Sequence, residues 1–133
     1  MGPTSPVYTW QDARCSADFL SSLPVPESHL RLSSGYGCAT LFWLVKNKPE
    51  ILEKYDRCGT IMDFIVALFT NSDIVKTSDQ LAASWGYFNT VKSKWNTDII
   101  EPCGFPVDML PQGYYNFLCL DLNFSRSFKT FKT

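Results

Sequence analysis

Gly35-Tyr36-Gly37-Cys38-Ala39-Thr40-Leu41-Phe42-Trp43-Leu44 is the stretch of this sequence that says most about the fold. Its two glycines are typical of a loop, and they allow the backbone to approach another segment or a ligand closely. Leu41, Leu44 and Val45 then recur at three- and four-residue spacing, which predicts a helix directly after the loop. Taken alone, such a loop more often only leads the chain into a helix than binds a ligand.

Capping residues and helical spacing predict further helices on both sides of this stretch. Ser16 can cap a helix that Pro24 ends, and Pro49 suits the first turn of a helix that stops by Gly59. Apolar residues at helical spacing predict another helix over 61–68. A capped turn is expected over 77–83 and a short helix over 95–100.

Few segments favour strands, so the predicted class is α/β with helices dominating and few short strands. The β-branched and aromatic run Val7–Trp10 is predicted to be a strand, and 74–75 and 87–89 to be extended. Residues 1–6 are expected to form a flexible leader and 7–111 one domain. Residues 112–133 show neither helix caps nor clean alternation, and they are expected to be poorly ordered.

Composition and charge exclude several classes of function. The chain has 133 residues, enough for one domain, with 12 basic and 13 acidic residues spread along it. No basic stripe or polybasic cluster indicates nucleic acid or an anionic membrane as a partner. The most apolar run, 61–69, is too short to span a bilayer. Because the N-terminus also lacks the pattern of a secretory signal, a cytoplasmic location is expected.

The cysteines indicate free thiols rather than disulfides or a metal site. Their number is odd, their gaps are wide and none forms a C-x-x-C pair: Cys15, Cys38, Cys58, Cys103 and Cys119. With His29 as the single histidine, a zinc site is not expected. Reduced thiols agree with a cytosolic protein.

No complete catalytic motif is present, so no catalytic residue and no metal ligand is assigned. The candidate substrate-binding residues suit a polyol: a tryptophan face packs on the C–H side of a sugar, and charged or hydroxyl groups bind its oxygens. These candidates are Trp10, Asp12, Arg14, Tyr36 and Thr40. Each has a structural alternative, with Trp10 in a core and Asp12 and Arg14 as a local ion pair. Asp79 is interpreted as a helix cap rather than a ligand.

Taken in order, five segments resemble the FGGY family of carbohydrate kinases, and within it the members that act on a seven-carbon ketose. They lie between Val7 and Pro111, at residues 9–15, 35–44, 59–64, 78–90 and 104–111. The resemblance implies a two-lobed, ribonuclease H-like (actin-like ATPase) fold and phosphorylation of a ketose by ATP with magnesium. In related kinases the tryptophan matching Trp10 lies against the substrate, and residues matching 35–40 approach it.

The departures from the family pattern concern phosphate transfer. No Asp-Gly-Thr phosphate loop, no Gly-Gln-Met-His segment and no Gly-Asp motif in the family's context is present. We therefore expect an incomplete N-terminal kinase lobe that binds neither ATP nor magnesium alone, shows no kinase activity, and binds sugar weakly or not at all. Self-association through exposed apolar surface is expected too. Two alternatives remain open: a non-catalytic sugar-binding or regulatory module that partners a full-length kinase, and a helical interaction domain without a sugar role.

Overall fold

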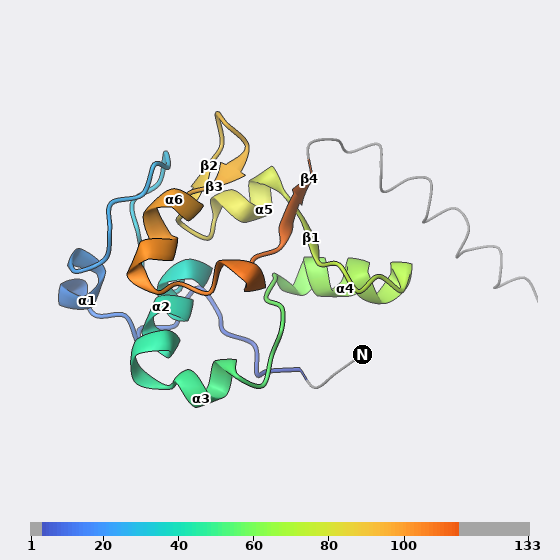
Figure 1. The fold of residues 1–133 in the computed structure, drawn as a ribbon, viewed down its shortest axis with the longest axis horizontal. Coiled ribbons are helices and arrows are strands. Elements are labelled where there is room, and N and C mark those ends of the chain that lie inside the picture. The colour runs from blue at the N-terminus through green and yellow to red at the C-terminus, as the bar shows by residue number, and fades with distance from the viewer. Residues whose placement is uncertain (1–3, 115–133) are drawn as a thin grey trace, which may run out of the picture.

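Helices supply most of the regular structure in residues 4–114, the part of the chain that this computed structural model describes (Figure 1). The helices are α1 (Ala17–Ser21), α2 (Gly37–Asn47), α3 (Pro49–Leu52), α4 (Ile61–Thr70), α5 (Asp79–Ala83) and α6 (Thr97–Ile100), followed by the 3-10 turns Glu101–Cys103 and Val107–Met109. The strands are β1 (Lys76–Ser78), β2 (Phe88–Asn89), β3 (Lys94–Trp95) and β4 (Gln112–Tyr114). The helix-dominated α/β class is thereby confirmed. The predicted leader and tail fall partly outside the described residues.

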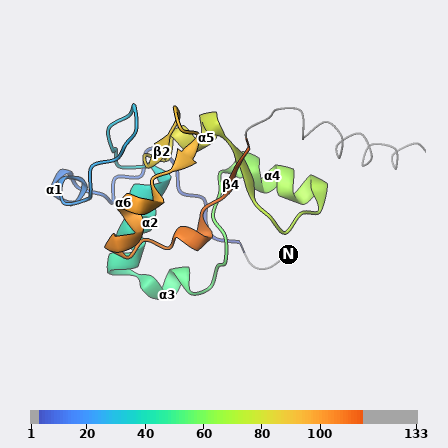
Figure 2. The same ribbon diagram turned by 45° about the horizontal axis from the view of Figure 1, so that its top comes forward.

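Two short strand pairs organise the chain after α4. β1 and β4 are parallel, with Lys76 opposite Gln112 and Ser78 opposite Tyr114. β2 and β3 form an antiparallel pair in which Phe88 is opposite Trp95. α5 packs against both β1 and β4, whereas α4 packs against β1 (Figures 1 and 2). Because parallel strands need a long crossover, residues 79–111 fold back before β4 can pair with β1.

The core surrounds α2, the helix that the glycine stretch begins. Cys38, Leu41 and Phe42 from α2 are buried with side chains from the second half of the chain: Trp85, Tyr87, Ile100, Phe105 and Leu110. The Phe42 ring lies 4.8 Å from that of Phe105, centroid to centroid, in an edge-to-face arrangement. Such aromatic pairs add about 1 kcal/mol beyond the burial of apolar area.

The predicted helix starts are confirmed where a cap or a proline marks them. The Ser16 hydroxyl accepts a hydrogen bond from the Phe19 amide at 3.2 Å, and α1 follows. The Ser78 hydroxyl accepts from the Leu81 amide at 3.3 Å, so Ser78 rather than Asp79 caps α5. Pro49 begins α3, but that helix ends at Leu52, well before Gly59.

The strand predictions are less accurate. Val7–Trp10 is wrong as a strand, because no strand within residues 4–114 pairs with it and a turn follows, in which the Asp12 amide donates to the Thr9 carbonyl at 3.0 Å. The strand expected at 74–75 begins at Lys76, where pairing with β4 starts. β4 itself was not predicted. The helix expected from Trp95 starts at Thr97, because Trp95 pairs in β3.

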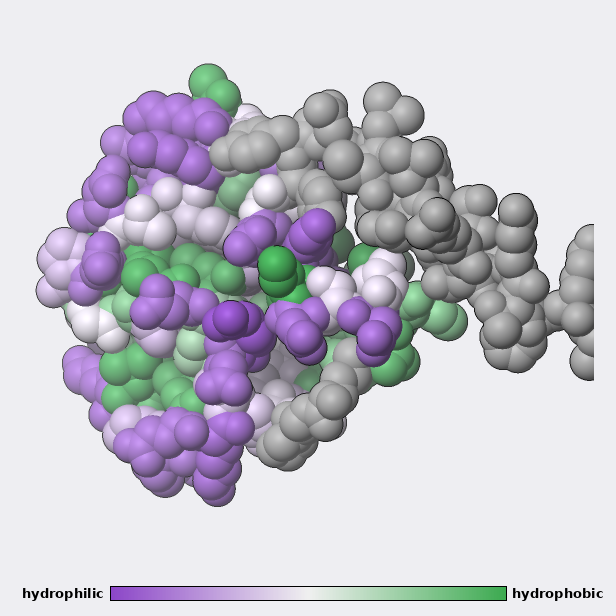
Figure 3. Space-filling model, turned by 45° about the vertical axis from the view of Figure 1, so that its right-hand side comes forward, coloured by the Kyte–Doolittle hydropathy of each residue, from purple (hydrophilic) through white to green (hydrophobic). Residues whose placement is uncertain are grey.

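α4 is a helix as predicted, and it turns an unexpected face inward. Asp63 and Ala67 are its buried residues, while its large apolar side chains lie mostly at the surface. Figure 3, turned so that the α4 side of Figure 1 comes forward, shows apolar side chains exposed there. Within residues 4–114, no helix is both long and apolar enough to cross a membrane.

Candidate functional site

Trp10 lies on a loop whose backbone is held in place while its side chain remains 81% exposed. The turn from Thr9 to Asp12 closes the loop, and the Ser34 hydroxyl donates a 2.6 Å hydrogen bond to the Asp12 carbonyl. Gly35, with φ at +91°, lies against the Trp10 backbone. A fixed loop that presents an exposed indole offers a flat apolar surface to a ligand.

Asp12 and Arg14 form a bidentate ion pair beneath this loop. The Arg14 Nε and Nη2 atoms donate to the two carboxylate oxygens of Asp12, each at 2.8 Å. The guanidinium carbon also lies 4.5 Å from the Tyr8 ring centroid and 5.2 Å from that of Trp43. Hydrogen bonding from Arg14 lowers the pKa of Asp12, and the same bond raises the pKa of Arg14. Both charges are therefore satisfied within the protein, as the ion-pair alternative predicts.

The other two candidates lie at the start of α2. Tyr36 directly precedes the helix and is half-buried, whereas Thr40 is 4% exposed. The Cys15 thiol donates to the Ala39 carbonyl at 3.4 Å, which ties the segment after Arg14 to this helix. The structure thus brings Trp10, Asp12 and Arg14 close to the glycine loop, and it buries the Thr40 side chain.

Several residues that build this region were not predicted from sequence. Ser34 holds the Trp10 loop, and Tyr8 and Trp43 flank the Arg14 guanidinium. Trp85 lies behind Gly37, where an added Cβ atom would stand 2.4 Å from the indole ring. Trp43 and Trp85 lie within the family-like segments 35–44 and 78–90, but their roles depend on contacts between segments distant in sequence.

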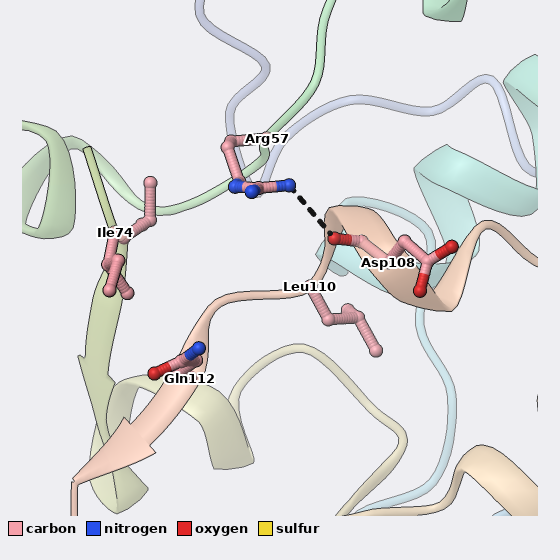
Figure 4. Close-up of a pocket in the computed structure, with 6 residues that line it drawn as sticks. Arg57, Ile74, Asp108, Leu110 and Gln112 are labelled. Atoms are coloured by element: carbon pink, nitrogen blue, oxygen red, sulfur yellow. Dashed lines mark hydrogen bonds between the residues drawn. The ribbon is translucent and has the colours of Figure 1, made fainter.

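A separate polar cavity lies where β1 and β4 begin (Figure 4). It has a volume of about 320 Å³ and is lined by Arg57, Ile74, Val75, Asp108, Leu110 and Gln112. The Arg57 guanidinium donates to the Asp108 carbonyl at 3.4 Å, while the Asp108 carboxylate points away from it. None of the predicted substrate-binding residues lines this cavity.

Metal-ligating side chains do not cluster in the part of the chain that the structure describes. Among residues 4–114, no three histidine, cysteine, aspartate or glutamate side chains gather closely enough to hold a metal ion. Asp79 uses one carboxylate oxygen to accept a hydrogen bond from the Ser93 hydroxyl at 2.6 Å. Its other oxygen is buried and has no hydrogen-bond partner among residues 4–114, and the same holds for Asn96 Oδ1.

Comparison with known proteins identifies the family. Residues 3–116 match the N-terminal domain of the FGGY family of carbohydrate kinases. The chain belongs to this family. Over 107 residues it is 54% identical to a sedoheptulokinase of Mus musculus and 53% identical to a sedoheptulokinase of Homo sapiens. This FGGY chain is also 28% identical, over 122 residues, to a glycerol kinase of Burkholderia cenocepacia.

These FGGY relatives are much longer than the chain. The match to the mouse sedoheptulokinase covers 80% of this chain and 22% of that protein, and the match to the glycerol kinase covers 80% and 24%. A crystal structure of gluconate kinase from Lactobacillus acidophilus superposes with a TM-score of 0.62 at 18% identity, covering 80% of this chain and 23% of that one. This likeness confirms the actin-like, ribonuclease H-like fold expected for the FGGY N-terminal domain.

Proposed function

We propose that this chain forms part of the N-terminal domain of a kinase that phosphorylates a ketose such as sedoheptulose with ATP and magnesium. The observation that carries the proposal is the 54% identity over 107 residues to a sedoheptulokinase. The identity to glycerol kinases falls to 28% over a similar region. The higher identity to a sedoheptulokinase therefore favours a ketose over glycerol as the substrate.

We further propose that the Trp10 loop forms one wall of the sugar site. The indole is 81% exposed, and Ser34 and Gly35 hold its backbone. Asp12 and Arg14 position the loop through their mutual ion pair rather than by touching sugar. Tyr36 is half-buried beside the loop and remains a candidate contact. Thr40 is buried at 4% exposure, so its hydroxyl is not included in this wall.

Phosphate transfer by the 133-residue chain alone is not expected. Transfer needs a phosphate cradle, a held metal ion and a base for the acceptor hydroxyl. The sequence contains no such set of motifs, and residues 4–114 bring together no metal-binding group. We propose that the polypeptide supplies one part of the sugar site and that the chemistry depends on other residues.

The free state of the described cysteines supports a cytoplasmic location.

The decisive experiment compares two polypeptides in a coupled assay of ADP release. The longest polypeptide encoded with this sequence should turn over sedoheptulose faster than xylulose, glycerol or gluconate, and the 133-residue chain should show no turnover. In the longer protein, Trp10→Ala should raise the KM for sedoheptulose about tenfold or more, because the stacking surface is lost.

Val25→Ala is the matched control for that substitution, because Val25 is 84% exposed on another loop. It should leave the KM unchanged. A preference for glycerol or gluconate would contradict the proposed substrate class. An unchanged KM in Trp10→Ala would contradict the proposed wall, and saturable turnover by the 133-residue chain would contradict its inactivity.

A further inference from the structure

The glycine loop lies directly against two residues from the second half of the chain, Trp85 and Gly86. The Cys38 amide donates a hydrogen bond to the Trp85 carbonyl at 3.2 Å. A Cβ atom added at Gly37 would stand 2.4 Å from the Trp85 indole. One added at Gly86 would stand 3.3 Å from the Tyr36 ring. Because protein interiors are closely packed, a methyl group fits at neither glycine without displacing an aromatic ring.

The Trp85 side chain is held by a second contact besides the one with Gly37. Its indole lies 6.0 Å from that of Trp95, centroid to centroid, in an edge-to-face arrangement. The Trp95 Nε1 atom donates to the Pro111 carbonyl at 2.8 Å. Trp85 is 8% exposed. A ring packed in this way has little room to move, so a smaller side chain at residue 85 would remove support from the glycine loop.

Gly86 allows the Tyr36 ring to lie close to its backbone. It has φ at +109°, a conformation that favours glycine, and it is buried. An added Cβ atom would also stand 2.7 Å from the side chain of Leu32, which precedes the glycine loop. The place of the Tyr36 ring therefore depends on Gly86, and the place of the backbone beside it depends on Trp85.

We propose that Trp85 and Gly86 are positioning residues of the sugar site, because they set where the Tyr36 ring lies. The inference rests on the proposed function, in which Tyr36 is a candidate contact of the wall beside Trp10. A contact made equally with bound substrate and transition state changes KM rather than kcat. Loss of either positioning residue should therefore raise the KM for the acceptor and leave kcat nearly unchanged.

The first test observes the Tyr36 ring directly, by fluorine NMR of the 133-residue chain labelled with fluorotyrosine. The signal that is missing in Tyr36→Phe belongs to this ring. Trp85→Leu and Gly86→Ala should each shift or broaden it. Leu44→Ala is the matched control, because Leu44 is 2% exposed and lies in α2 about two turns after Gly37. It removes buried apolar volume as well, but it should leave the Tyr36 signal in place.

The second test measures kcat and KM in the longest polypeptide encoded with this sequence. The acceptor is whichever of sedoheptulose, xylulose, glycerol and gluconate the wild type turns over best. Trp85→Leu and Gly86→Ala should each raise its KM about fivefold or more and change kcat less than about twofold. Leu44→Ala should leave both constants unchanged at a temperature where all variants are folded.

A double variant tests the contact between Gly37 and Trp85. Gly37→Ala should raise the KM, although alanine is the better helix former, because its methyl group meets the indole. Trp85→Leu removes that ring. Gly37→Ala combined with Trp85→Leu should therefore raise the KM by less than the product of the two single effects. A combined effect equal to that product overturns the contact as the means of positioning.

The outcomes separate this inference from the proposed function. An unchanged Tyr36 signal or an unchanged KM in Trp85→Leu and Gly86→Ala, in a protein that turns over its acceptor normally, overturns the positioning role alone. So does a KM that rises equally in Leu44→Ala. A longer wild-type protein that turns over none of the four acceptors overturns the proposed function and the positioning role together.

Discussion

The backbone of Gly35 lies so close to Trp10 that a Cβ atom at residue 35 would stand 2.1 Å from the Trp10 carbonyl oxygen. The same glycine has φ at +91°, a conformation that residues with a side chain rarely adopt. Both constraints act on the loop that carries the exposed indole. The position of Trp10 therefore depends on a residue 25 places later in the chain.

Gly35→Ala should destabilise the protein strongly, and Gly104→Ala is its control. Gly104 also has a positive φ, at +78°, but nothing lies within 4 Å of an added Cβ atom there. Gly104→Ala should cost about 1 kcal/mol of unfolding free energy through backbone strain alone. Gly35→Ala adds a clash with backbone and should cost about 3 kcal/mol or more. Urea unfolding measures both, and equal losses would refute the close approach.

The ion pair of Asp12 with Arg14 should make stability sensitive to acid. The hydrogen bonds from Arg14 lower the pKa of Asp12 below 3.8 in the folded protein. The ion pair therefore stabilises the folded protein above pH 3.8. It is lost as the pH falls through the folded pKa. Asp12→Asn should cost about 1–2 kcal/mol of unfolding free energy near pH 7, and the difference from wild type should shrink at about pH 2.5.

Asp98→Asn serves as the control for this pair. The Asp98 carboxylate lies 3.8 Å from the Lys94 ammonium, but both side chains are mostly exposed. Removing such a surface pair should cost about 0.5 kcal/mol or less. Chemical unfolding at both pH values compares the two variants. If Asp12→Asn cost no more than Asp98→Asn, the ion pair would not hold the Trp10 loop.

Asp63 should show the opposite dependence on pH. Burial raises its pKa above 3.8 despite the hydrogen bonds from Thr60. A raised folded-state pKa means that its contribution to stability is largest below pH 3.8 and is lost as the pH rises through the folded pKa. The unfolding free energy of wild type relative to Asp63→Asn should therefore fall between about pH 3 and pH 7.

Asp63→Ala separates the charge of this residue from its capping bonds. It removes the acceptor for both Thr60 groups and should cost about 2 kcal/mol near pH 3, a cost that falls with rising pH as it does for Asp63→Asn. Asp63→Asn keeps an acceptor oxygen and should cost less. A difference between wild type and Asp63→Asn that does not change with pH would show that the carboxyl is not buried as described.

The thiols should differ sharply in reactivity. Burial raises the pKa of Cys58 to about 12, and its thiol donates to the Met109 carbonyl at 3.0 Å. Cys15 and Cys38 are buried, and burial raises the pKa of both. Cys103 is exposed. In a Cys119→Ser background, Ellman's reagent at about pH 8 should modify Cys103 rapidly and the other three only after unfolding.

Cys103→Ser in the same background checks the assignment. It should abolish the rapid phase and leave the slow phase unchanged. A second cysteine that reacts rapidly in the native protein would contradict the burial of Cys15 and Cys38 or the hydrogen bond that holds the Cys58 thiol.

The local signals in the sequence predicted the helices well. Ser16, Ser78 and Pro49 mark helix starts because a cap or a fixed φ acts within a few residues. The strands were predicted poorly, because a strand needs a partner. Val7–Trp10 has β-forming residues but pairs with none of the described strands, whereas Gln112–Tyr114 lacks an alternating pattern and pairs with β1.

The candidate site was predicted in part. The spacing of Trp10, Asp12 and Arg14 was enough to propose both a sugar surface and a local ion pair. The ion pair forms because residues two apart can meet through a turn. Ser34, Trp43 and the burial of Thr40 depend on where α2 packs, so no local pattern revealed them.

The sequence by itself determined the family, the helix starts and the glycine loop, because these follow from local motifs and short-range hydrogen bonds. Only the tertiary structure decided which face of each element is covered. In α4 the apolar pattern forms a helix, yet the capping box of Thr60 and Asp63 and the packing of Ala67 turn that pattern outward. The exposure of the Trp10 side chain was likewise decided by the tertiary structure. Contacts with Gly35 and Ser34 hold the backbone of the Trp10 loop in a position that leaves the indole at the surface.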